Sequence, residues 1–314
     1  MPLRLIAVVG PTASGKTALA VRLAHRLNGE IVSADSMQIY RRMEIGTAAP
    51  TEAEKEGIPH HMIGILEPNE PFSCADYAAR AAACIRGIAE RGKTPILCGG
   101  TGLYLDSLLR GGTFSDAASS PAIRDALLAY AEQNGREALH ARLRDVDPAS
   151  ADAIHPNNVR RVVRALEIHE ATGVTKTEWD RRSLTAERQY DACILALDYL
   201  SRQRLYDRID RRVTAMIDAG LIEEARALYD SGLLSPESIA GQAIGYKEWL
   251  PYFSGSCTAA DAAEQIRLAS RRYAKRQLTW FRRYPDAVWL YPDGENMTPD
   301  TLLELALASV QNRL

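Results

Sequence analysis

The stretch that most directly predicts chemistry is GPTASGKT, which begins at residue 10 of the 314-residue chain. It fits the pattern G-x-x-x-x-G-K-[ST], whose glycines let backbone N–H groups converge on an anion. Lys16 adds a positive charge, Thr17 can ligate Mg²⁺, and the N-terminus of the expected helix adds positive potential. The loop therefore predicts a polyphosphate site. Its residues are Gly10, Pro11, Thr12, Ala13, Ser14, Gly15, Lys16 and Thr17.

The nature of that phosphate depends on a nearby acid. A nucleoside triphosphate is the usual ligand, but a Walker-type NTPase also needs an Asp at the end of a neighbouring apolar strand. The candidate strand PILCGG is followed by Thr101, and the acid in a matching position is Asp35, at the end of EIVSAD. Asp35 could be a helix cap or turn former, or a carboxylate held beside the bound phosphate. The residues alone leave both interpretations open.

A second chemical signal is a basic run near the end of the chain, RLASRRYAKRQLTWFRR, with seven Lys or Arg and no acid. On a helix, Ala274, Leu278 and Phe281 would face a core, and the basic side chains would share the other face. Because exposed helix faces usually mix both signs, this stripe predicts a surface that contacts a phosphate backbone. It comprises Arg272, Lys275, Arg276, Thr279, Arg282 and Arg283.

A smaller basic cluster occurs in NNVRRVVRALEI, where Arg160, Arg161 and Arg164 stand at helical spacing. Arg161 and Arg164 could equally pair with Glu167 or Glu170. Two basic surfaces on separate parts of the chain favour a clamp, and a single-stranded or looped RNA fits it because its bases can be splayed out.

Three arginines in RLYDRIDRRV allow the same two interpretations. Arg208, Arg211 and Arg212 could contact phosphate, but intrahelical pairing with Asp207 and Asp210 is at least as well supported by the spacing.

Composition narrows the class of protein. The net charge of −2 argues against a general nucleic-acid binder, so the distribution of charge matters more than its sum. No apolar stretch approaches the roughly 20 residues needed to span a bilayer, so we expect a cytoplasmic protein without a membrane partner. The five cysteines are widely spaced without a C-x-x-C pair, which predicts buried thiols and no zinc site.

The elements that must position these residues follow from alternating apolar runs and helical segments. Helical patterns such as 17–27 and 76–90 separate short apolar runs that read as strands. The runs are 5–10, 30–35, 61–66, 95–100, 192–197 and 287–291. This alternation predicts an α/β fold with a parallel sheet and a ligand crevice at the carboxyl ends of its strands. With the glycine loop, it indicates a P-loop NTPase-like core.

The composition and periodicity of the sequence change between residue 121 and about residue 190, where Ala, Arg, Glu and Leu recur with helical periodicity. Because a strand pattern resumes afterwards, we expect an inserted all-helical domain, with GGTFSDAASSP as its hinge. The predicted domains are residues 1–115 and 191–314 for the α/β core, including the basic C-terminal helix, and residues 116–190 for the insertion.

Together these features closely resemble the bacterial tRNA dimethylallyltransferases, which prenylate the adenine on the 3′ side of the anticodon. The resemblance runs through GPTASGKT, DSMQIYRRMEIGTAAP, PHHMI, GGTGLY, RALEI, QAIGYKE and YAKRQLTWFR, in order and over nearly the whole chain. It implies transfer of a dimethylallyl group from dimethylallyl diphosphate to N6 of that adenine, with Mg²⁺ as cofactor. The expected partners are dimethylallyl diphosphate and a tRNA anticodon stem-loop, and the expected state is a monomer.

The resemblance also implies residue roles. Asp35 takes the place of the proposed general base, which is needed because the N6 lone pair is delocalised into the ring. Residues 12–17 would hold the diphosphate leaving group. Thr101 and Arg124 would steady that diphosphate as negative charge develops on it.

The implied RNA contacts lie in four segments and at Thr101 and Arg124. The segments comprise Asp35, Ser36, Met37 and Gln38; Arg160, Arg161, Val162, Val163 and Arg164; Gln242, Ala243, Ile244, Gly245, Tyr246 and Lys247; and Lys275, Arg276, Gln277, Leu278, Thr279, Trp280, Phe281 and Arg282. The inserted domain, residues 116–190, would then bind tRNA, and the target base would leave its stack to enter the crevice. Without the resemblance, QAIGYKE could be a glycine-containing turn between helices.

Two rival functions use the same loop. A small-molecule kinase predicts an Asp that ends a metal-binding strand and an Arg-rich lid. An RNA-binding NTP switch that transfers no group would not explain a common role for Asp35, Thr101 and Arg124.

Overall fold

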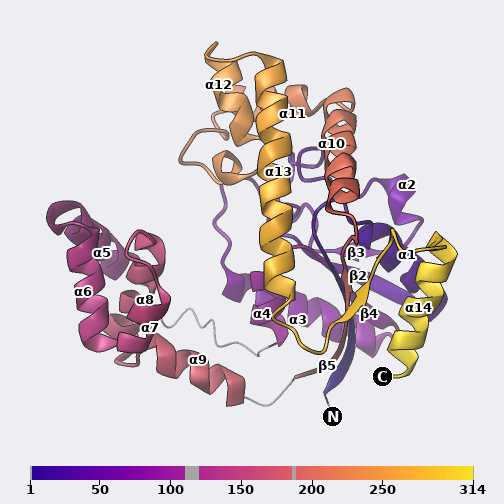
Figure 1. Ribbon diagram of the computed structural model, residues 1–314, viewed down its shortest axis with the longest axis horizontal. Coiled ribbons are helices and arrows are strands. Elements are labelled where there is room, and N and C mark those ends of the chain that lie inside the picture. Colours follow the sequence, from indigo (N-terminus) through magenta and orange to yellow (C-terminus); the bar gives the residue numbers. More distant parts are fainter. Residues whose placement is uncertain (1, 110–119, 186–188, 314) are drawn as a thin grey trace. The chain divides into compact units, whose positions relative to one another are not determined.

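The computed structural model of the chain describes residues 2–109, 120–185 and 189–313 (Figure 1). These residues form two compact units. The first, here called the core unit, comprises Met1–Ser73, Arg80–Asp106 and Tyr190–Leu314. The second, the helical unit, comprises Cys74–Ala79 and Ser107–Gln189. Most of the segment predicted as a hinge, residues 111–119, lies outside the described residues.

The core unit is built on a parallel six-stranded sheet with the order β3-β2-β4-β1-β5-β6. The strands are β1 Leu3–Val9, β2 Gly29–Ala34, β3 His60–His61, β4 Thr94–Gly99, β5 Tyr190–Leu197 and β6 Val288–Leu290. Every pair of neighbouring strands is parallel. Residues 5–9 of β1 are all buried, as expected for a strand covered on both faces. The predicted α/β class is confirmed.

The predicted strand at residues 61–66 is wrong in its length. β3 contains only His60 and His61, which pair with β2. Met62 and Gly64 then adopt φ angles of 66° and 59°. Because a strand requires negative φ, these two residues turn the chain away from the sheet. Leu66 then forms an isolated bridge with residue 40, outside the sheet.

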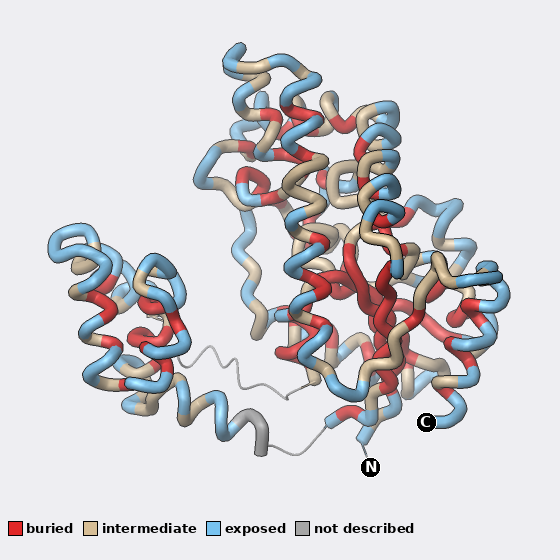
Figure 2. The backbone as a smooth tube through the Cα atoms, in the orientation of Figure 1, coloured by how far each residue is buried: buried red, intermediate tan, exposed pale blue. Residues whose placement is uncertain are grey.

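Helices complete the core unit, and the buried residues gather on the sheet and on the inner sides of these helices (Figure 2). The helices are α1 Lys16–Leu27, α2 Glu52–Lys55, α3 Cys74–Glu90, α4 Gly102–Leu109, α10 Arg202–Asp218, α11 Leu221–Asp230, η2 Ala240–Gln242, η3 Lys247–Trp249, α12 Leu250–Phe253, α13 Ala259–Phe281 and α14 Pro299–Gln311. Two of them, α3 and α4, extend into segments assigned to the helical unit. Within the described residues, no helix is long and apolar enough to cross a bilayer.

Helix α13 carries the predicted basic stripe. It begins with a capping box, in which Thr258 and Asp261 satisfy each other's backbone N–H groups. Ala274 and Leu278 are buried and pack with residues of α10 in one apolar cluster. Lys275 is exposed, as are the other predicted stripe residues. The helical spacing thus predicted correctly which side of α13 faces the core.

The helical unit has an apolar core of its own. Its helices are α5 Pro121–Asn134, α6 Arg136–Val146, α7 Pro148–Ala153, α8 Val159–Thr172 and α9 Lys176–Thr185. Leu127, Leu139, Leu143 and Leu166 meet between α5, α6 and α8. The described part of this region contains helices and no strand, as its periodicity predicts.

All five cysteines are free thiols. Cys98 and Cys193 are buried, and burial raises the pKa of Cys98 to about 11. Cys74, Cys84 and Cys257 are only partly buried, so the expectation of full burial is wrong for these three.

Candidate active site

The glycine loop connects the end of β1 to α1 in a conformation that its surroundings fix. A Cβ on Gly10 would lie only 3.0 Å from Leu197 O, so the close approach of two backbones requires glycine there. Gly15 precedes α1 with a φ of 92°, a left-handed conformation that glycine adopts without strain. Ala13 also has a positive φ, 61°, and its carbonyl accepts a 2.8 Å hydrogen bond from Arg208 Nε on α10. Contacts from distant segments therefore hold the loop.

Lys16 and Arg212 bring two positive charges to the loop. Lys16 Nζ donates to Pro11 O at 3.2 Å, and Arg212 extends from α10. Burial lowers the pKa of Lys16, the charge of Arg212 lowers it further, and Asp35 acts in the opposite direction. Burial also lowers the pKa of Arg212, and again Asp35 opposes the shift. Two partly buried cations that repel each other make a site that favours a polyanion.

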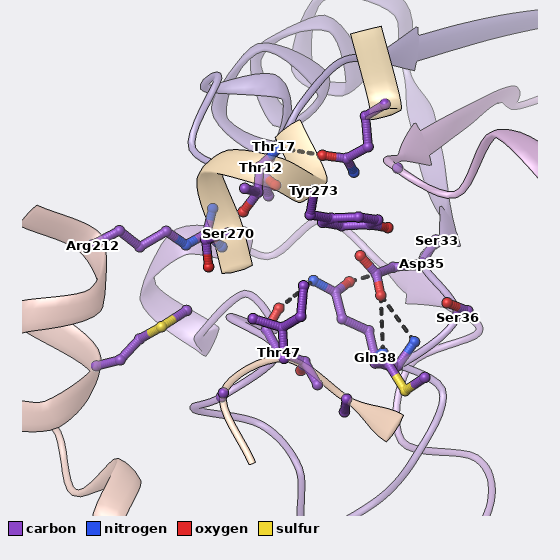
Figure 3. A pocket seen from close by; sticks show the side chains of 18 of the residues that line it. Thr12, Thr17, Ser33, Asp35, Ser36, Gln38, Thr47, Arg212, Ser270 and Tyr273 are labelled. Atoms are coloured by element: carbon purple, nitrogen blue, oxygen red, sulfur yellow. Dashed lines mark hydrogen bonds between the residues drawn. The ribbon is translucent and has the colours of Figure 1, made fainter. Parts of the chain in front are cut away.

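Both cations line a cavity at the carboxyl ends of β1, β2 and β4 (Figure 3). At about 260 Å³ it lies just below the roughly 300–1,000 Å³ of drug-sized ligand sites, so it suits a compact ligand. Its polar end is formed by the glycine loop, with Thr12 and Thr17 in the wall. Its apolar wall comprises Ile63, Ile209, Val213, Met216, Ile244 and Ile266. The cavity can therefore hold an anionic head with an apolar tail.

Asp35 follows β2 and lies in the wall of the same cavity (Figure 3). Its Oδ1 accepts hydrogen bonds from the N–H groups of Met37 at 2.9 Å and Gln38 at 3.3 Å. The interpretation of Asp35 as a turn former is thus confirmed. Within the described part of the chain, Oδ2 receives no such bond. One oxygen fixes the carboxylate while the other remains able to accept a proton.

Thr101 ties the ends of β2 and β4 together. Its N–H donates to Ala34 O at 3.0 Å, and its Oγ1 accepts from Ser36 N–H at 3.0 Å. Gln38 anchors the next loop, because its Nε2 donates to the carbonyls of Thr47 and Ala48. Thr101 adjoins the cavity without lining it, and its predicted role toward the diphosphate stays a prediction.

Helix α13 contributes Ile266, Ser270, Tyr273, Arg276 and Gln277 to the cavity. Burial raises the pKa of the Tyr273 hydroxyl, and Asp35 adds to this shift. The guanidinium carbon of Arg276 lies 5.5 Å from the centre of the Tyr273 ring. Of the segment predicted to contact RNA, Gln277, Leu278 and Phe281 are buried, whereas Lys275, Arg276, Thr279 and Arg282 are exposed.

The segment of residues 242–247 forms a turn between η2 and η3, consistent with its interpretation as a glycine-containing turn. All of its residues line the cavity except Tyr246, which is fully buried. The Tyr246 hydroxyl donates to Glu224 Oε1 at 2.6 Å and accepts from Gly46 N–H at 3.2 Å. Tyr246 therefore anchors the turn and does not itself reach the cavity.

The arginines of α10 do not make the intrahelical ion pairs that their spacing allowed. Asp210 pairs with Arg271 of α13, and Arg211 Nε donates to the main-chain oxygen of Asp207. Arg208 holds the glycine loop, and Arg212 enters the cavity. Sequence reasoning left the role of Arg212 undecided. The signal was present, because 209, 212, 213 and 216 share one helix face and all four line the cavity.

A strand-end aspartate that sequence reasoning missed is Asp198, directly after β5. Its Oδ1 accepts from Tyr199 N–H at 2.8 Å and its Oδ2 from Arg282 at 3.3 Å. Asp198 is buried and does not line the cavity. Its position thus differs from the metal-binding Asp that a kinase would need.

The other predicted site residues belong to the helical unit. Arg124 and Arg164 bind opposite oxygens of the fully buried Glu167, at 2.9 and 2.8 Å, and Ser120 N–H also donates to it. Burial alone would raise the pKa of Glu167, but these hydrogen bonds lower it. The alternative that paired Arg164 with Glu167 is confirmed. Arg161 is exposed.

The remaining residues of the predicted RNA-contact segment 160–164 are either exposed or part of the apolar core. Arg160 is exposed, whereas Val162 and Val163 lie in the apolar core of the helical unit. The predicted roles of Arg124 and of residues 160–164 toward ligands stay predictions.

Comparison with known proteins agrees with this geometry. The protein-family model described as IPP transferase matches residues 38–284, and that described as isopentenyl transferase matches residues 3–63. Two similar relatives are the tRNA dimethylallyltransferases of Bacillus pumilus, 49% identical over 94% of this chain and 90% of that protein, and of Bacillus subtilis, 48% identical over 96% and 93%.

Solved structures agree as well. The full-length tRNA isopentenylpyrophosphate transferase of Bacillus halodurans is 42% identical and aligns with a TM-score of 0.72 over 99% of this chain and 97% of that one. A eukaryotic dimethylallyltransferase acting on tRNA is 28% identical, with a TM-score of 0.83 over 100% and 81%. The predicted P-loop NTPase-like core is thus confirmed. The chain belongs to the tRNA dimethylallyltransferase family.

Proposed function

We propose that this protein transfers a dimethylallyl group from dimethylallyl diphosphate to N6 of the adenine on the 3′ side of the anticodon in tRNA, releasing diphosphate. The observation that carries the proposal is a single cavity lined by the glycine loop, by an apolar wall and by Asp35. Only one oxygen of the Asp35 carboxylate, Oδ1, is held by backbone N–H groups. A small-molecule kinase would explain the loop, but its small acceptor would not need the basic stripe that α13 exposes.

The diphosphate would lie on residues 12–17, between Lys16 and Arg212. The five-carbon group would then point along the apolar wall formed by Ile209, Val213 and Ile266. Burial of this group stabilises the complex, while the cations stabilise the charge that grows on the departing diphosphate.

In the transfer step, adenine N6 attacks the allylic carbon that carries the diphosphate. The carbon–oxygen bond breaks, and its electron pair leaves with the diphosphate. The proton released from N6 passes to Asp35 Oδ2, because Oδ1 is held by the N–H groups of Met37 and Gln38. Thr101 and Arg124 are further proposed contacts of the leaving diphosphate.

The residues present fit a bound Mg²⁺. Thr17, whose hydroxyl can ligate the ion, lines the cavity beside the residues proposed to hold the diphosphate. When bound, the ion would neutralise charge on the diphosphate.

For tRNA, the exposed cations Lys275, Arg276 and Arg282 of the core unit offer a phosphate-binding surface, and Arg160 and Arg161 offer one on the helical unit. The target adenine would leave the anticodon loop and enter the cavity, at low cost because the loop is already partly unpaired. We further propose a cytoplasmic monomer.

The proposal is tested by incubating the protein with dimethylallyl diphosphate labelled in the allyl group, MgCl₂ and unmodified tRNA. We expect label in RNA, and N6-dimethylallyladenosine after nuclease digestion. A parallel reaction with γ-labelled ATP tests the kinase alternative. Label transfer from ATP to an acceptor, with none from dimethylallyl diphosphate, would refute the proposal.

A further inference from the structure

A single buried side chain of α13 connects the glycine loop to the sheet. Gln277 Oε1 accepts a 2.9 Å hydrogen bond from Thr12 N–H, and its Nε2 donates to Gly100 O at 3.0 Å. The first of these bonds is drawn at Thr12 in Figure 3. Gln277 is 4% exposed, although its neighbours Lys275 and Arg276 are exposed on the same helix.

The two partners of Gln277 define which side chain can stand here. Thr12 N–H can only donate and Gly100 O can only accept, so the bridge needs an acceptor and a donor at the same side-chain terminus. Glutamate would place a negative oxygen against the Gly100 carbonyl, and methionine would satisfy neither group. The position is tightly packed as well, since a Cβ on Gly100 would lie 2.1 Å from Gln277 Nε2.

The bridge also connects the two chemical parts of the cavity. Thr12 opens the segment proposed to hold the diphosphate, and its neighbour Ala13 keeps a positive φ of 61°, which persists only where contacts enforce it. At the other end, Gly100 is followed by Thr101, whose hydroxyl accepts from Ser36 N–H beside Asp35. A continuous path of bonds thus runs from the diphosphate loop to the turn that holds the proposed base.

We infer that Gln277 is a positioning residue that sets the diphosphate loop relative to Asp35, and that it is not an RNA contact. This inference rests on the proposed function for its substrate. Helix α13 then serves two ligands from two faces: Gln277 fixes the leaving-group site from the buried face, and exposed cations such as Lys275 meet the RNA.

The test compares three single variants: Gln277→Met, Gly100→Ala and, as the matched control on the exposed face, Lys275→Met. For each, the Kd for inorganic diphosphate with MgCl₂ is measured by calorimetry, the Kd for unmodified tRNA by filter binding, and kcat and KM for dimethylallyl diphosphate by label transfer. Thermal unfolding followed by circular dichroism identifies any variant that fails to fold.

For Gln277→Met we expect about a tenfold weaker diphosphate affinity and a higher KM, because a buried N–H and a buried carbonyl lose their partner. The Kd for tRNA should stay within about twofold of wild type. Lys275→Met should instead weaken tRNA binding and leave the Kd for diphosphate unchanged. The double variant Gly100→Ala/Gln277→Met should be no worse than the poorer single variant, since both changes break the same bridge.

Wild-type diphosphate affinity in Gln277→Met would overturn the inference, and so would a loss of tRNA affinity as large as that of Lys275→Met. If Gln277→Met does not fold, Gly100→Ala decides by the same two criteria. Diphosphate binding is measured without turnover, so the two proposals can fail separately. If Gln277→Met weakens diphosphate binding but the wild-type protein transfers no allyl group, the proposed function is refuted and the role of Gln277 is not.

Discussion

The two units of this chain differ in how far their charged side chains are neutralised by partners within the protein. In the core unit, Lys16 and Arg212 line a cavity, repel each other and have lowered pKa values, with Asp35 compensating only in part. In the helical unit, Arg124 and Arg164 share the buried carboxylate of Glu167, which also accepts a backbone N–H.

This difference separates cations that a ligand would neutralise from a buried carboxylate that stabilises the fold. The Glu167 carboxylate is satisfied within the protein, so its removal should change stability. The cavity cations have an excess of positive charge that a ligand would neutralise, so their removal should change affinity or turnover.

Substitution of the proposed base should have the largest effect. Asp35→Asn keeps an oxygen for the Met37 and Gln38 N–H groups, so the turn survives while the proton acceptor is lost. We expect kcat to fall by about 10²- to 10⁴-fold with little change in the Kd for tRNA. Steady-state label transfer at saturating substrate gives kcat, and filter binding gives the Kd for tRNA. A variant with normal turnover would show that Asp35 only shapes the turn.

Breaking the buried cluster of the helical unit should act on stability. Glu167→Gln removes the fully buried negative charge that Arg124 and Arg164 share. We expect a loss of about 2 kcal/mol from the unfolding free energy of the helical unit, measured by denaturant titration, because water screens the two partly exposed guanidinium groups. The exposed pair of Lys176 and Asp180 supplies the control, since Asp180→Asn should change stability by less than about 1 kcal/mol. Equal effects of the two changes would contradict a structural role for Glu167.

Acid should destabilise the core unit through a second buried carboxylate. Burial would raise the pKa of Glu30, but His61, Lys93 and Arg91 together lower it to about 2. Because the folded pKa is below the unfolded value, this stabilisation is complete above about pH 4.5 and is lost as the pH falls toward 2.

Thermal unfolding of wild type and Glu30→Gln between pH 2 and 7 measures this contribution. We expect the wild type to lose on the order of 2 kcal/mol more than the variant over that window. Parallel pH profiles for the two proteins would show that Glu30 is not involved. The carboxylate lies at the start of β2, at the opposite end of that strand from Asp35, so diphosphate affinity at neutral pH should stay unchanged.

Removal of one cavity cation should have the smallest effect of the four. Arg212→Met takes one charge from the cavity but leaves Lys16, so we expect the Kd for diphosphate to rise about tenfold without loss of stability. Arg211→Met, one residue away and exposed, is the matched control. If both changes weaken diphosphate equally, the effect comes from the general charge of α10 and not from the cavity.

Local patterns in the sequence predicted much of this architecture. Alternating apolar runs gave the parallel sheet, the glycine motif placed the loop after a strand, and helical spacing separated Ala274 and Leu278 from the exposed face of α13. Each of these signals lies within about one element, where side-chain periodicity reports directly on burial.

What the sequence did not predict depends on contacts between distant segments. Gln277 meets Thr12 across 265 positions of the chain; helical spacing places it on the buried face with Ala274, but no local pattern shows which groups it bonds. Arg212 lines the cavity from α10, which packs against α13 through Leu205 and Ile209. The shortness of β3 arises from positive φ angles at Met62 and Gly64, the first of which no propensity favours.

The proposed reaction requires one cavity to hold both the leaving diphosphate and the base that accepts the proton. The most direct measurement is a crystal structure with dimethylallyl thiolodiphosphate, a slowly reacting analogue, and an unmodified anticodon stem-loop. We predict diphosphate oxygens on the N–H groups of residues 13–17, with adenine N6 within hydrogen-bond distance of Asp35 Oδ2. Diphosphate bound elsewhere, or adenine outside the cavity with Asp35 facing solvent, would contradict the claim.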